Sequence, residues 1–154
     1  MKPTCHQIND YWEGFILELN DQVYDRIVKL CNEGNAFIEK GKDDKAIESY
    51  IAALDLVPLP KTDWETSTWI YTALGDTYFL TREYEKAKSN LYNALNCPDG
   101  ISNPFILLRL GESLFECGEL DKAKEYLLRA YILEGYKLYY NEDEKYFELI
   151  KDMI

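Results

Sequence analysis

One pattern of small residues occurs three times along the 154-residue chain, and it constrains the fold more than any other feature of the sequence. In each copy a glycine is followed 12 residues later by an alanine, and a second alanine follows seven residues after the first. Small residues in a fixed register allow two helices to approach closely, while large side chains near them fill the remaining space. The pattern therefore predicts three pairs of packed helices. The glycines are Gly34, Gly75 and Gly111, and the alanines are Ala46 and Ala53, Ala87 and Ala94, and Ala123 and Ala130.

The rest of the sequence predicts helices before, within and after the three copies. A first helix is expected over Ile8–Leu19. A last helix is expected over about 142–153, where Phe147 and Ile150 would cover the end of the stack, because an open end leaves an apolar face in water. The helices of the three pairs are expected at about 20–40, 43–56, 63–81, 84–97, 103–117 and 120–134.

Capping side chains mark several of these helix starts. Asn103 followed by Pro104 is typical of an N-cap and a first helical turn. At three other starts the sequence leaves two candidate caps each: Asn20 or Asp21, Asp63 or Thr62, and Asn141 or Asp143.

Two positions depart from the repeated pattern. Arg82 stands where Gly41 and Gly118 stand in the other copies, which predicts a turn of different shape or a strained turn. Gly135 replaces the proline that closes the first copy at Pro58. The last helix of the third copy is therefore expected to run on or to bend near Gly135.

Over residues 27–137 the sequence resembles the tetratricopeptide repeat (TPR), a helix–turn–helix unit of about 34 residues. The three glycines lie 41 and 36 residues apart, so both connections carry insertions. The resemblance implies an all-α fold, an α-solenoid of three TPR units with an N-terminal helix and a C-terminal capping helix, in one domain over 1–154. The tail is also similar to the ends of short standalone bacterial TPR proteins. The repeats would span about 27–60, 68–101 and 104–137, and the capping helix about 142–153.

In TPR proteins the first helix of each repeat lines the concave face, and ten of the positions that the resemblance places on this face are expected to contact a partner. The face is expected to be aromatic, with Trp69 and Phe105, and acidic, with Asp76 and Glu112. It would suit an apolar partner segment that carries Lys or Arg. Two other interpretations stay open: the aromatic residues belong to the core, or the N-terminal helix covers the face with the aromatic residues of 11–16. The ten residues are Asn35, Trp69, Thr72, Asp76, Phe79, Phe105, Leu108, Arg109, Glu112 and Phe115.

One TPR subtype grips the acidic C-terminal tails of cytosolic chaperones with two lysines, two asparagines and one arginine. A face that carries acids would repel such a tail. Both lysines are also absent here, so this subtype is disfavoured. The matching positions hold Cys31, Asn35, Ala73, Phe105 and Arg109.

The formal net charge of −11 limits the classes of partner. Nucleic acids and anionic membranes favour basic faces, so neither is expected to bind. A basic protein would be attracted, although acidity also serves solubility alone.

The N-terminus lacks an apolar signal core, no stretch approaches the roughly 18 apolar residues of a transmembrane helix, and the four cysteines form no CxxC pair. The expected compartment is therefore the reducing cytoplasm.

The sequence predicts neither an enzyme nor a cofactor. His6, the one histidine, follows Cys5, and neighbours along a chain seldom face each other as a catalytic pair must. The chain has no phosphate-binding, dinucleotide-binding or HExxH motif. One histidine and four dispersed cysteines also form no metal-binding pattern.

The predicted function is a non-enzymatic protein-interaction module, an adaptor or scaffold that captures a short partner segment. The alternative is an immunity-type inhibitor that masks a folded, often basic, toxin or enzyme domain, since small acidic TPR proteins of bacteria resemble candidates for this role. An inhibitor of this kind would bury more than about 1,200 Å² in a 1:1 complex. The chain itself is expected to be a monomer or a weak homodimer.

Overall fold

The computed structural model describes residues 19–154, so the helix predicted over Ile8–Leu19, with its aromatic side chains, lies outside the described residues except for Leu19. The described residues form seven α-helices and four short 3-10 helices. The α-helices are α1 (Asp21–Glu39), α2 (Asp43–Leu56), α3 (Glu65–Leu80), α4 (Tyr84–Leu95), α5 (Pro104–Glu116), α6 (Leu120–Glu134) and α7 (Glu144–Glu148). The 3-10 helices are η1 (Lys61–Asp63), η2 (Gly100–Ser102), η3 (Tyr136–Tyr139) and η4 (Lys151–Met153).

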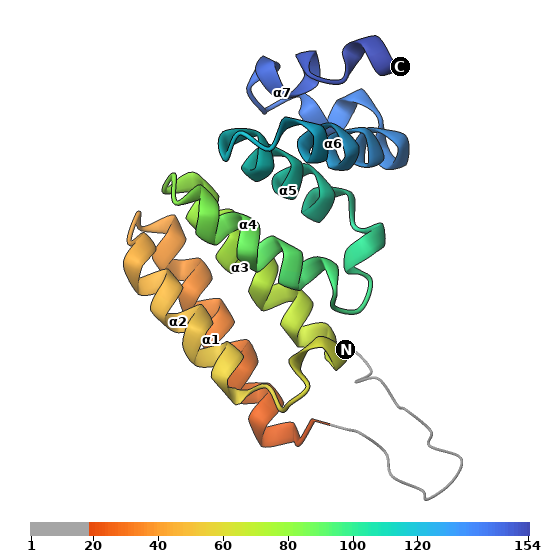
Figure 1. Ribbon diagram of the computed structural model, residues 1–154. Coiled ribbons are helices and arrows are strands. Elements are labelled where there is room, and N and C mark those ends of the chain that lie inside the picture. The colour runs from red at the N-terminus through yellow and green to blue at the C-terminus, as the bar shows by residue number, and fades with distance from the viewer. Residues whose placement is uncertain (1–18) are drawn as a thin grey trace, which may run out of the picture.

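The helices are arranged as three antiparallel pairs stacked in sequence order, α1 with α2, α3 with α4, and α5 with α6 (Figure 1). Each helix packs most extensively on the partner of its own pair, and α2 and α4 also pack on the first helix of the next pair. Within the described residues the chain is therefore the all-α solenoid of three units that the sequence predicts.

The small residues of the repeated pattern are the points at which paired helices meet. A Cβ atom added to Gly34 would lie 2.5 Å from Tyr50 Cε1, and one added to Gly75 would lie 2.5 Å from Leu91 Cγ. The six alanines of the pattern are all fully buried. The repeat therefore encodes helix packing, as predicted, because a larger residue at these glycines would push the two helices apart.

The turn inside each pair has the same backbone conformation, including the turn that lacks a glycine. The φ angle is +68° at Gly41, +65° at Arg82 and +79° at Gly118, all in the left-handed region. The Arg82 amide donates to the carbonyl three residues before it, and the Glu83 amide donates to the carbonyl five residues before it. The amides at the equivalent positions of the other two turns make the same hydrogen bonds. The prediction of a differently shaped turn at Arg82 is therefore wrong, and the predicted strain is confirmed, since only glycine adopts such φ angles without cost.

The predicted caps are partly confirmed. Asn20 Oδ1 accepts from the Gln22 amide at 2.9 Å, and Asn103 Oδ1 accepts from the Phe105 amide at 3.0 Å. Asp63 and Thr62 are wrong as caps of α3, because both lie in η1 and the residue that precedes α3 is Trp64, which makes no side-chain cap.

The chain after α6 folds back along the end of the stack. Helix α6 ends at Glu134 and does not run on, because the next residue, Gly135, turns the chain with a φ of +74°. The continuous last helix predicted over 142–153 is wrong: α7 has only five residues, and the chain continues through η4. Asp143 caps α7 by accepting from the Lys145 amide at 3.0 Å. Residues 136–154 are called the C-terminal segment below.

Candidate protein-binding face

Helices α1, α3 and α5 each turn one side away from their partner helices, and we call this surface the first-helix face. The residue after each pattern glycine marks equivalent positions on it: Asn35, Asp76 and Glu112. Asn35 is exposed, the Asp76 side chain is 33% exposed, and the Glu112 side chain is fully buried. Among residues 19–154 the face is therefore open at the first repeat and closed at the third.

The open part of the face lies on α1 and α3. Asn35 Oδ1 accepts from the Tyr50 hydroxyl at 2.7 Å, which fixes the amide against α2. Trp69 keeps 38% of its surface exposed, and Thr72, half-buried, donates its hydroxyl to the Thr68 carbonyl at 2.6 Å. Because Trp69, Thr72 and Asp76 are spaced by three and four residues, they form one row along α3.

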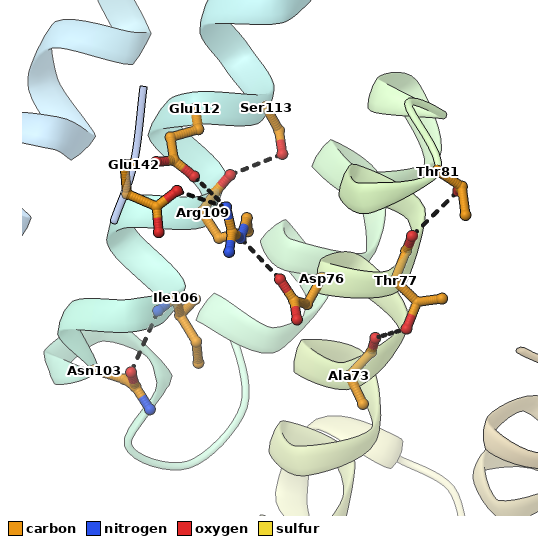
Figure 2. Close-up of polar contacts among 10 residues, drawn as sticks. All are labelled: Ala73, Asp76, Thr77, Thr81, Asn103, Ile106, Arg109, Glu112, Ser113 and Glu142. Atoms are coloured by element: carbon orange, nitrogen blue, oxygen red, sulfur yellow. Dashed lines mark hydrogen bonds and ion pairs between the residues drawn. The ribbon is translucent and has the colours of Figure 1, made fainter. Parts of the chain in front are cut away.

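The closed part of the face is built around Arg109 of α5, which is 7% exposed (Figure 2). Its Nη1 donates to Glu112 Oε2 at 2.7 Å and to Glu142 Oε2 at 3.1 Å. Its Nε lies 2.8 Å from Asp76 Oδ1, an ion pair whose N–H is not directed at the oxygen. One guanidinium therefore joins carboxyl groups from α3, from α5 and from the C-terminal segment.

Two aromatic residues of the face flank the same guanidinium. The Arg109 Cζ atom lies 4.5 Å from the centre of the Phe79 ring and 5.2 Å from the centre of the Phe105 ring. Both phenylalanines are half-buried. A cation over an aromatic ring is stabilised by the negative charge of the ring face. These rings therefore shield the chain's own cation.

The C-terminal segment covers the rest of the third repeat. The Tyr146 ring of α7 packs edge-on against Phe115 at 5.3 Å and lies 6.4 Å from Phe79. Its hydroxyl donates to Glu116 Oε1 at 2.6 Å. Leu108, a predicted contact residue, is 1% exposed beneath this layer. The segment thus occupies the part of the face where a partner was expected to bind.

Burial changes the ionisation of the acids around Arg109. Loss of solvent raises the pKa of Glu112 to about 9; the positive charge of Arg109 opposes this, and the nearby Glu142 carboxylate adds to it. Burial also raises the pKa of Asp76, against the lowering effect of Arg109. Burial therefore favours the neutral form of Glu112 near neutral pH, and its Oε1 is buried without a hydrogen-bond partner among the described residues.

The family model of the tetratricopeptide repeat matches the chain twice, at residues 30–58 and at residues 106–133. These segments span the pairs α1–α2 and α5–α6, and the α3–α4 pair between them has the same fold and register. The chain is a tetratricopeptide-repeat protein.

Solved structures share the TPR fold over most of the chain. The C-terminal TPR-containing domain of a Plasmodium falciparum FK506-binding protein is 21% identical, with a TM-score of 0.69 over 87% of this chain and 90% of that one. The Yersinia enterocolitica secretion chaperone SycD, in complex with a peptide of the translocator YopD, is 18% identical, with a TM-score of 0.67 over 87% and 96%.

The first TPR domain of Spaghetti (RPAP3), bound to the HSP90 peptide SRMEEVD, is 20% identical, with a TM-score of 0.66 over 89% of this chain and 94% of that one. At these levels of identity the likeness shows the fold alone. No curated protein matches the sequence.

The structure thus divides the ten predicted contact residues of this TPR protein into buried residues and residues that keep exposed surface. The expectation that Glu112 forms an exposed acidic pair with Asp76 is wrong, because Glu112 is buried on Arg109. Leu108 and Arg109 are buried as well, so these three residues offer no surface to a partner. The residues that keep exposed or half-exposed surface are Asn35, Trp69, Thr72, Asp76, Phe79, Phe105 and Phe115.

Glu142 is a site residue that the sequence analysis missed. It lies 33 residues from Arg109 in the chain and was part of the predicted capping helix. Helical spacing relates neighbours along one helix only, and no local pattern links Glu142 to α5. The one available signal was Arg109 itself, the single basic residue of an otherwise acidic and apolar face, since a buried cation requires acidic partners.

Other reactive groups in the described part of the chain do not gather into a site. Residues 19–154 hold no cluster of metal-binding side chains. Cys31, Cys97 and Cys117 are free thiols, and burial raises the pKa of each to about 11, so they are protonated at neutral pH. Cys5 and His6 lie outside the described residues. No α-helix of residues 19–154 has the length and apolar character needed to span a membrane.

Proposed function

We propose that this TPR array binds a segment of another protein on the open part of its first-helix face, on α1 and α3, and catalyses no reaction. Trp69 carries the proposal, because it is 38% exposed in a row with Thr72 and Asp76. Exposed aromatic side chains commonly anchor protein interfaces. Peptide-bound structures of the RPAP3 domain and SycD, which share the fold, support this use of it.

The partner segment is apolar and carries a Lys or Arg. Asp76, Glu112 and Glu142 surround one guanidinium, so the cluster keeps a negative excess even with Glu112 protonated. Arg109 is buried among these acids and offers no cation to an acidic ligand. Asp76, one-third exposed at the edge of the open part, is the acid that a basic partner residue would reach. The free thiols of the described cysteines fit a reducing compartment such as the cytoplasm.

A peptide library displayed on phage, selected against the immobilised full chain, tests the proposal. We expect selection to enrich peptides that combine large apolar residues with Lys or Arg. The Kd of a selected synthetic peptide should rise by about tenfold or more for Trp69→Ala, as expected for an interface anchor. Asp76→Asn should weaken Lys-containing peptides more than their Lys-free versions.

Ile51→Ala is the matched control, because Ile51 is 43% exposed on α2, the second helix of its pair. It should leave the Kd unchanged, and thermal melting should show that all variants are folded. Glu112→Lys is not a useful probe, because it places a charge in the buried cluster. Equal binding of selected peptides by the wild type and Trp69→Ala, or no enrichment at all, would contradict the proposal.

The inhibitor function is a second candidate, favoured by the net charge of −11, which would draw a basic toxin or enzyme domain. It predicts that isolated peptides bind weakly and that a folded partner forms a tight 1:1 complex. Sedimentation of the complex and the area of its interface separate the two functions, since a folded partner buries more than about 1,200 Å².

A further inference from the structure

Two exposed apolar side chains and one acid lie in line along α3. Trp69 is 38% exposed, Leu80 is 62% exposed, and the Asp76 side chain between them is 33% exposed. Asp76 follows Trp69 by seven residues and Leu80 follows it by eleven, all within one helix. Positions seven and eleven residues after a first one lie within about 20° of it around a helix axis. The three residues therefore share one side of α3, and we call them the anchor row.

The other sides of α3 face neighbouring helices. Leu74 is buried in the core that α3 shares with α1 and α2, and the Phe79 ring lies against Arg109 of α5. Trp69 and Leu80 are the two residues of α3 that are classed as exposed. The anchor row is therefore the side of α3 that residues 19–154 leave most open to a partner.

The spacing of the anchor row fits a helical partner better than an extended one. Along a helix axis, seven residues span about 10 Å and four residues span about 6 Å. An extended segment would cover these two steps with about three and about two residues. Its side chains alternate in direction, so the odd step would turn one of the three contacts away from α3. In a helix laid beside α3, residues that are seven and eleven positions apart share one side, as they do in α3 itself.

The neighbours of α3 also favour a partner that runs along this helix. A segment that crossed the face from α1 to α5 would meet the C-terminal segment, which contacts α5 through Glu142 and Tyr146. Asp76 lies with its Oδ1 buried against Arg109 (Figure 2), so a partner cation would approach its Oδ2.

We propose that the open part of the first-helix face binds its partner segment as an amphipathic α-helix laid along α3, an inference that rests on the binding function proposed above. The helix carries two large apolar residues eleven positions apart, one on Trp69 and one on Leu80. A Lys or Arg that faces Asp76 lies between them, four positions from the residue on Leu80. The same spacing holds for either direction of the bound helix.

Selection of phage-displayed peptides of 16 or more residues on the full chain tests this spacing. The enriched sequences should carry the apolar pair eleven positions apart with the basic residue four from one of them. A proline placed midway between the apolar residues of a selected synthetic peptide should raise its Kd by about tenfold or more, because proline breaks a helix. The same proline placed outside the apolar pair is the control and should have little effect.

Leu80→Ala in the full chain should raise the Kd of the selected peptide by about tenfold, as expected for an anchor. Leu59→Ala is the matched control, because Leu59 is 81% exposed between α2 and α3 and lies outside the row. It should leave the Kd within about twofold of the wild-type value. Both residues are well exposed, so both variants should melt like the wild type.

Two kinds of failure are distinguishable. If selected peptides lose affinity for Trp69→Ala but bind Leu80→Ala like the wild type, or tolerate the central proline, the helical partner is overturned while the binding function stands. If no peptide is enriched, or if Trp69→Ala binds like the wild type, the binding function fails and the helical partner fails with it.

Discussion

Helices α1 and α5 hold equivalent places in their repeats, yet the first-helix face is open on one and covered on the other. The residue two positions before the pattern glycine is Asn32 on α1, which is exposed, and Arg109 on α5, which is buried. Both helices pack on their partners through the same glycine contact. The difference comes from the C-terminal segment, which lies on α5 through Glu142 and Tyr146. A repeat therefore fixes how its two helices pack, and its neighbours decide what its outer side can bind.

Removing Arg109 tests this difference most strongly. Arg109→Ala leaves Asp76, Glu112 and Glu142 without their shared cation, and breaking a buried ion pair in this way costs about 3 to 5 kcal/mol. Asn32→Ala, at the equivalent exposed position of α1, should leave the free energy of unfolding unchanged. Urea denaturation measures both. Equal effects of the two substitutions would mean that the two faces do not differ as described.

The pH dependence of stability sharpens the comparison at Glu112. Its pKa is raised in the folded protein, so between the unfolded value near 4.5 and the folded value of about 9 the folded state binds more protons than the unfolded state. Stability is therefore lost as the pH rises through this range. Glu112→Gln, which keeps the neutral form, should remove that loss, so that its melting temperature exceeds the wild-type value by a margin that grows from pH 5 to pH 8.

Glu116, one turn further along α5, is a control with the opposite sign. Burial raises its pKa, but hydrogen bonds from Lys145 and Tyr146 outweigh this and lower it. Its contribution to stability is present above the unfolded pKa and is lost as the pH falls through the folded one. Glu116→Gln should therefore destabilise the protein at neutral pH and have less effect in acid. If Glu112→Gln behaved in the same way, Glu112 would be ionised in the folded protein.

The smallest expected effect belongs to the open part of the face. Asn35→Ala removes the hydrogen bond from the Tyr50 hydroxyl, and one neutral hydrogen bond near the surface contributes about 0.5 to 1.5 kcal/mol. Tyr50→Phe should cost a similar amount, and the double variant should cost little more than either single one, as in a double-mutant cycle. A loss as large as that of Arg109→Ala would show that the first repeat is locked in the same way as the third.

Local sequence signals predicted the helices well where a glycine or a cap marks the boundary. Helices α2 and α6 have the predicted bounds, since each follows a turn that is closed by a left-handed glycine. The start of α3 was predicted less well, because the residues after the prolines form η1 before the helix begins. The continuous last helix was also wrong, because α7 ends at Glu148 and the chain turns to bury Ile150 fully.

The sequence by itself determined the paired helices of this TPR protein, their register and the helix side that forms the first-helix face. These features depend on residues close in sequence, whose small size or turn conformation acts wherever they occur. Only the tertiary structure decided that Glu112 and Arg109 are buried while Trp69 and Asp76 keep surface. Burial and ionisation depend on all neighbours in space, and for Arg109 one of these, Glu142, lies 33 residues away in the C-terminal segment.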